Sequence, residues 1–205
     1  MSSHNARHLQ DVILGGQDGL VNVLGLSIGV VGATADPSLV LVSGLAALFA
    51  ESISMGAVAY TSTNAALDCE KKHALEADLG RNEIESILRS LPGPLAPAKR
   101  AFIRSRLLRH EDEAASGAPV SKAIKVWLST MVGSFIPLAP YFLFPVWTAA
   151  VLSILLSAIV LFLTGALKAH WTIGDWKRSG LEMLVVGGLA ALAGYLVGHL
   201  LRVPA

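Results

Sequence analysis

The chain has 205 residues, of which 53% are hydrophobic, with a mean hydropathy of +0.59 and a formal net charge of +1. This apolar composition exceeds that of ordinary soluble domains and indicates an integral membrane protein. The near-zero net charge excludes a bulk field that would attract nucleic acid. A single cysteine, Cys69, excludes an internal disulfide framework. The N-terminus carries little positive charge and no A-x-A site, so we expect no removable signal peptide.

Five apolar segments are long enough to cross a bilayer as helices, at about residues 9–35, 39–62, 123–144, 146–168 and 180–201. Between the second and third spans, the polar residues 63–121 predict a helical insert. Prolines and a glycine at 92–97 divide it into pieces at 64–91 and 98–115. We therefore expect an all-α membrane protein of five transmembrane helices with a helical cytoplasmic insert between helices 2 and 3. The expected domains are residues 9–62, 63–121 and 122–202.

Two carboxylates fall within the first two spans. Glu51 lies near the middle of the second span, one helical turn before Met55, and Asp18 lies in the first span close to Gln17 and Asn22. Ionisable groups inside a membrane are costly, and they usually face a bundle interior or a water-filled path. The alternatives are a solvated Asp18 at the cytoplasmic helix end and a purely structural Glu51.

Small residues and prolines predict how the spans pack. The pairs Gly15/Gly19, Gly25/Gly29 and Gly194/Gly198 are small-xxx-small patterns that allow close helix approach. Residues 25–29 also match G-x-S-x-G, but that catalytic elbow needs a strand-to-helix turn, so helix packing is favoured. Pro137 and Pro140 should kink or interrupt the third span. We interpret His199 as an interfacial residue.

The insert carries possible metal ligands. On a helix, Cys69, His73 and Glu76 share a narrow stripe, and Glu83 joins them if the helix continues through Gly80. A solvated charged surface gives a similar pattern. The second piece is basic and amphipathic, which is typical of a helix lying against anionic headgroups, and it ends in the acidic run HEDE at 110–113. That run can close a metal site, but it is not the H-E-x-x-H of metalloproteases.

Basic residues are concentrated on one side of the predicted membrane. Nearly all lie in the N-terminal segment, the insert and the loop between spans four and five, which leaves Arg202 alone on the other side. The positive-inside rule then places the N-terminus and insert in the cytoplasm and the C-terminus on the opposite side. A compact chain without targeting extensions leads us to expect a bacterial-type plasma membrane.

Several runs together resemble the vacuolar iron transporter family over nearly the whole chain. They are DGLV at 18–21, AESISMG at 50–56, YTS at 60–62, GSFIPLAPY at 133–141, LFLTGALK at 161–168 and RSGLE at 178–182. Two departures stand out. The chain has Val58-Ala59-Tyr60 where many relatives have Gly-Glu-Tyr, and its insert is shorter and poorer in closely spaced glutamates.

The resemblance implies a homodimer of five-helix subunits in membrane lipid that exchanges cytosolic Fe2+ or Mn2+ for protons. It implies that Asp18, Glu51 and Met55 line the ion path. It also implies a metal-binding insert, for which the candidate residues are Glu70, His73, Glu76, Glu83, Glu111 and Glu113, with Glu85 as a weaker one.

The residues support this reading independently of the family. Two intramembrane carboxylates bind either a divalent ion or protons, and a thioether favours Fe2+ over Mg2+ or Ca2+. Zn2+ is a further ion for such ligands, and we expect no resident cofactor. The alternative function is a membrane-anchored metal sensor or scaffold that binds metal without transport. An enzyme is not expected, because no placed nucleophile and base were found.

Overall fold

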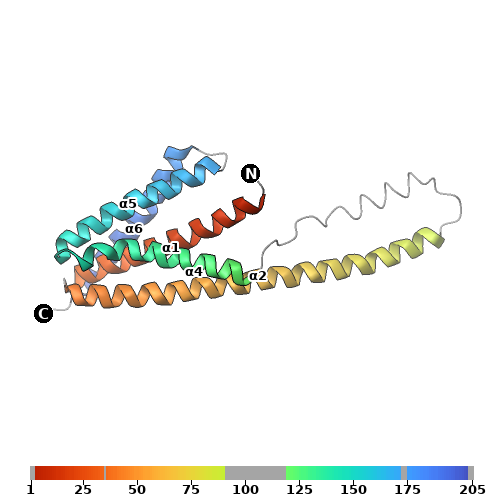
Figure 1. Ribbon diagram of the computed structural model, residues 1–205, viewed down its shortest axis with the longest axis horizontal. Helices are drawn as coiled ribbons and strands as arrows, with labels where there is room; N and C mark the ends of the chain where they lie inside the picture. The colour runs from red at the N-terminus through yellow and green to blue at the C-terminus, as the bar shows by residue number, and fades with distance from the viewer. Residues whose placement is uncertain (1–2, 35, 91–118, 172–174, 203–205) are drawn as a thin grey trace. The chain divides into compact units, whose positions relative to one another are not determined.

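The computed structural model describes residues 3–34, 36–90, 119–171 and 175–202, with side chains placed at 11–34, 36–73, 119–169 and 175–202. Within these ranges the chain is helical and contains no strand. The elements are α1 (Ser3–Ala33), α2 (Pro37–Ser90), α4 (Pro119–Leu138), the 3-10 helix η1 (Ala139–Phe142), α5 (Val146–Trp171) and α6 (Trp176–Leu200) (Figure 1).

Five segments of these helices are long and apolar enough to span a membrane. They are Asp11–Ala33, Pro37–His73, Pro119–Phe142, Val146–Ala169 and Trp176–Leu200. The predicted fold class, an all-α membrane protein with five transmembrane helices, is confirmed. The chain forms two compact units, one of Met1–Tyr60 with Val120–Ala205 and the other of Thr61–Pro119. The first unit contains all the interhelical contacts described below.

Helix α1 is held on two sides by contacts in which a glycine meets the backbone of its neighbour. A Cβ added to Gly133 of α4 would collide with the carbonyl of Gly16, and one added to Gly198 of α6 would collide with the carbonyl of Gly29. Inside a bilayer no hydrophobic effect drives helices together, so such close packing supplies much of the association. The predicted close-packing roles of Gly15, Gly19, Gly25, Gly29, Gly194 and Gly198 are all confirmed.

These contacts also give the helix directions. Along α1, Gly15 faces Val126 and Thr130, and Gly19 faces Thr130 and Ser134, so α1 and α4 run parallel. Gly25 faces Ala190 and Gly29 faces Gly194, so α6 is parallel to α1 as well. The G-x-S-x-G match at residues 25–29 therefore lies inside a packed helix, as expected. The starts of α1, α4 and α6 share one end of the unit.

Two prolines end α4 early. Neither Pro137 nor Pro140 has a backbone N–H, so each leaves a carbonyl of the preceding turn without its helical partner. The α-helix stops at Leu138 and the chain tightens into η1. The hydroxyl of Ser153 on α5 donates a hydrogen bond of 2.7 Å to the carbonyl oxygen of Pro137. The predicted interruption is confirmed, and the freed backbone oxygen is satisfied from a neighbouring helix.

Helix α2 continues past the end of the second span. The second span and the first piece of the insert, expected at residues 39–62 and 64–91, form one continuous helix of 54 residues. The apolar-to-polar change alters the solvent preference but not the backbone, because no proline or glycine separates Gly56 from Gly80 and good helix formers fill the interval. The predicted second piece, residues 98–115, lies outside the described residues.

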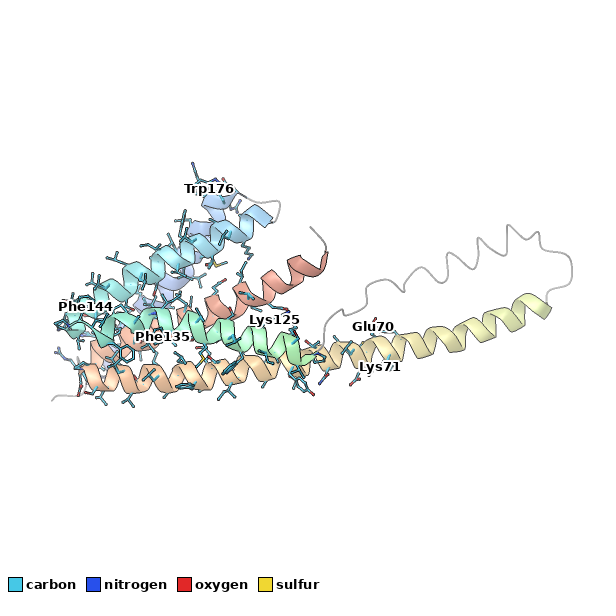
Figure 2. All side chains as sticks on the ribbon, in the orientation of Figure 1. Glu70, Lys71, Lys125, Phe135, Phe144 and Trp176 are labelled. Carbon is cyan, nitrogen blue, oxygen red and sulfur yellow. The ribbon has the colours of Figure 1, made fainter. Side chains whose placement is uncertain are left out.

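Aromatic side chains mark both ends of the first unit. Figure 2 shows Phe144, in the turn after η1, and Trp176, at the start of α6, at opposite ends of the helices. Phe142, Phe144 and Trp147 are exposed at one end, and Trp176 is exposed at the other. Tryptophan and other aromatic residues favour the membrane–water interface, so the two groups fit the two edges of a bilayer.

Candidate metal site within the membrane spans

The antiparallel helices α1 and α2 bring the intramembrane polar residues together along one line of contact. This line, called the seam below, contains Asp18, Asn22, Glu51 and Met55. The Nδ2 of Asn22 donates a hydrogen bond of 2.5 Å to Oε1 of Glu51. Asp18 lies close enough to Glu51 for the two carboxyl groups to interact electrostatically. Asp18 and Asn22 are one turn apart on the same face of α1, so Glu51 meets both. The pairing of Asp18 with Glu51 as a metal site stays a prediction, which transport measurements on variants can test.

Met55 lies one turn after Glu51 on α2 and is half-buried, as are Asp18 and Glu51. Since α1 and α2 run in opposite directions, one turn back from Asn22 on α1 corresponds to one turn forward from Glu51 on α2. This register places Met55 at the level of Asp18. Two carboxyl groups, one amide and one thioether are thus gathered over about one helical turn.

Packing behind the seam fixes its position. Val23, which follows Asn22, packs in a buried cluster with Leu48 of α2 and Leu138 of α4. Gly16 and Gly19, on either side of Asp18, lie against the backbone and side chains of α4. The apolar face of each helix is therefore committed to the core, and the polar residues are left on the other side of the seam.

Depth in the membrane gives this cluster its significance. At 1.5 Å per residue, Glu51 lies about 20 Å along α2 from Pro37, which is well inside a hydrocarbon core about 30 Å thick. The Asn22 side chain is exposed on the surface of the chain. Polar groups at this depth do not face lipid stably, so they require either a water-filled path or another protein surface.

The insert candidates are only partly described. Glu70 is half-buried, His73 is exposed, and Cys69 is an exposed free thiol. Helix α2 continues through Gly80, which is the condition for Glu83 to lie on the same stripe as Cys69 and His73. The side chains of Glu76, Glu83 and Glu85 lie outside the described residues, as do Glu111 and Glu113. Among the side chains that the structure places, no group of three or more His, Cys, Asp and Glu residues is arranged to hold a metal ion.

Asn22 is the site residue that sequence reasoning missed. It was recognised only as one of several polar residues in the first span. Its spacing of four residues from Asp18 was a usable signal, because i,i+4 positions share a helix face. The other predicted polar residue at a helix end, His199, lies near the end of α6 and stacks on Tyr195 with ring centroids 5.8 Å apart.

The fold and the seam define a polytopic helical membrane protein with a carboxylate-containing polar site inside its spans. Residues 9–199 match the VIT family, and the chain belongs to that family. It is 28% identical to vacuolar iron transporter 1 of Arabidopsis thaliana over 98% of this chain and 92% of the relative. It is 28% identical to protein CCC1 of Saccharomyces cerevisiae, over 97% and 70% respectively. It is 32% identical to vacuolar iron transporter cccA of Arthroderma benhamiae, over 91% and 77%.

Proposed function

We propose that this chain is a divalent transition-metal transporter that exports cytosolic Fe2+ or Mn2+ in exchange for protons. The observation that carries the proposal is the proximity of Asp18, Asn22 and Glu51 inside the membrane spans. Membership of the VIT family and the relatives named vacuolar iron transporters support metal transport. The site supplies the chemistry by which such transport is coupled to protons.

Two carboxyl groups placed close together can share a proton, because a protonated carboxyl donates a hydrogen bond that an ionised carboxylate accepts. Two close carboxylates resist being ionised together, whereas a divalent cation between them removes that repulsion. Proton occupancy and metal occupancy of Asp18 and Glu51 therefore exclude each other. Mutual exclusion at one site is the condition for exchange.

Met55 gives the site its preference among divalent ions. A thioether is a soft ligand that suits Fe2+ better than Mg2+ or Ca2+, whereas the two carboxylates also suit Mn2+. Zn2+ is a further candidate for such a mixed set. The cargo ion is a substrate of the site, and the proposal requires no resident cofactor.

A second copy of the chain is proposed to cover the seam. Asn22 is exposed although it is hydrogen-bonded to Glu51 at membrane depth. A two-fold dimer with this face at its interface would remove the polar groups from lipid and bring two Asp18–Glu51 pairs to one axis. The path would then run between the subunits.

The charges support a cytoplasmic location for the end of the unit at which α1, α4 and α6 begin. Lys122, Lys125, Lys177 and Arg178 lie at the starts of α4 and α6, and Lys168 lies near the end of α5. At the opposite end, the Lys or Arg residue among the described positions of the first unit is Arg202. The positive-inside rule then places the end where α1, α4 and α6 begin in the cytoplasm. A bacterial-type plasma membrane stays a prediction that cell fractionation can test.

Flux measurements in liposomes test the function. Purified protein is reconstituted with an internal dye quenched by Mn2+ and, in parallel, with an internal pH dye. We expect the wild type to move Mn2+ and protons in opposite directions. Asp18→Asn and Glu51→Gln should each reduce both fluxes by about 100-fold, the upper range for losing groups that support a metal site. Normal flux in both variants would overturn the site.

The matched control is Glu182→Gln, because Glu182 is an exposed carboxylate near the start of α6, paired with Arg178 at 3.3 Å. It should transport like the wild type. The sensor or scaffold alternative predicts a different pattern, in which the wild type binds Mn2+ but shows no flux under either pH gradient. An anchor has no use for paired carboxylates within its spans, so the seam favours transport. We likewise propose no enzymatic activity.

A further inference from the structure

Asn22 has a role of its own in the site. Its amide links α1 to α2 through a hydrogen bond to Oε1 of Glu51. We propose that Asn22 is a positioning and specificity-determining residue, which holds one oxygen of Glu51 so that the carboxylate binds the transported ion through its other oxygen. This inference rests on the proposed transport function.

The direction of the hydrogen bond follows from the chemistry of the groups. An ionised carboxylate accepts hydrogen bonds and donates none, so the amide must present Nδ2 and not Oδ1 to Glu51. The amide oxygen is then turned away from Oε1, and it is left as a neutral acceptor beside the carboxylates. One planar group thereby fixes the orientation of Glu51.

Holding Oε1 has a consequence for coordination. A partner on one carboxylate oxygen orients the group toward a metal, and such outer partners typically change metal affinity by 10–100-fold. With Oε1 engaged at 2.5 Å, Glu51 offers Oε2 to the ion. Ca2+ takes six to eight oxygens and often uses both oxygens of one carboxylate, whereas a smaller ion is satisfied by one. The Asn22 contact therefore disfavours Ca2+.

The surrounding structure makes Asn22 suited to this role. The residue after it, Val23, is fully buried against α2 and α4, so the backbone at this point of α1 is fixed. Asn22 itself is exposed and belongs to no apolar cluster. Its side chain therefore contributes little to packing, and removal of the amide is expected to change the site more than the fold.

The test measures Mn2+ transport in liposomes, with and without competing Ca2+. For Asn22→Ala we expect the KM for Mn2+ to rise by about 10-fold, with kcat changed less than threefold, and the Ca2+ concentration that halves transport to fall by about 10-fold. Asn22→Asp keeps the shape but loses the donor, so it should share the increased Ca2+ inhibition. Asn22→Gln restores an amide donor and should recover at least half of the discrimination.

Gln17→Ala is the matched control, because it removes an amide from a different face of α1, five residues before Asn22, and should leave both the KM and Ca2+ inhibition unchanged. Wild-type values in Asn22→Ala and Asn22→Asp would overturn the inference. Failure of the proposed function is distinguishable, since in that case Glu51→Gln would also transport normally. If Glu51→Gln is inactive while Asn22→Ala behaves as the wild type, only the role of Asn22 is lost.

Discussion

Gly133 on α4 lies directly against the backbone carbonyl of Gly16 on α1, and a Cβ at position 133 would overlap that carbonyl. The contact is two residues before Asp18, so it fixes the part of α1 that carries the first carboxylate. Close backbone packing is therefore part of the construction of the site as well as of the fold.

This contact predicts that Gly133→Ala reduces transport. The added methyl group forces α1 and α4 apart, a packing change that typically costs about 1–3 kcal/mol, and it displaces Asp18 from Glu51. We expect at least a 10-fold loss of Mn2+ flux and a lower apparent Tm in detergent. Gly188→Ala is the control, since a Cβ at Gly188 meets nothing within 4 Å. Equal flux in the two variants would contradict the prediction.

Met55→Leu tests the thioether. Leucine has a similar volume, so the fold should tolerate it at a cost below about 1.5 kcal/mol. Loss of the soft ligand should raise the KM for Fe2+ several-fold and the KM for Mn2+ less, because Mn2+ depends more on oxygen ligands. Competition between the two ions in liposomes measures the difference.

The control for that variant is Met131→Leu, because Met131 packs against the buried cluster of Val23, Leu48 and Leu138, away from the polar seam. It should leave the ratio of Fe2+ to Mn2+ transport unchanged. An unchanged ratio in Met55→Leu as well would show that Met55 is not a ligand.

Ser153→Ala tests the capping of the interrupted helix. The substitution leaves the buried carbonyl of Pro137 without the donor that now lies 2.7 Å from it, and an unsatisfied buried polar group costs about 1–3 kcal/mol. We expect a measurable fall in apparent Tm. Ser43→Ala should have little effect, because the Ser43 hydroxyl bonds to carbonyls of its own helix that already have helical partners.

Disulfide crosslinking tests the proposed dimer face. In a Cys69→Ser background, Leu26→Cys places a thiol one turn beyond Asn22 on the same face of α1, where Leu26 is exposed. Oxidation in membranes should give crosslinked dimers. Leu189→Cys, exposed on α6, should stay monomeric. Efficient crosslinking from Leu189 and none from Leu26 would place the interface elsewhere.

The sequence predicted the five spans because length and apolarity alone decide which helices cross a bilayer. The change from apolar to polar residues near residue 63 does not end α2, because a helix ends at proline, glycine or a cap and the sequence has none of these there. The sequence paired Asp18 with Glu51 from the cost of buried charge. The sequence did not single out Asn22, because the glycine contacts with α4 and α6 determine which side of α1 faces α2.

Those glycine contacts have a mechanical consequence. Any sliding of α1 against α4 or α6 drives backbone atoms into one another at Gly16 and Gly29. Helix α2 packs on α4 as well, because a Cβ added at Gly44 or Gly56 would meet Leu138 or Trp127. In the proposed transport cycle α1, α4 and α6 are thus expected to move as one body.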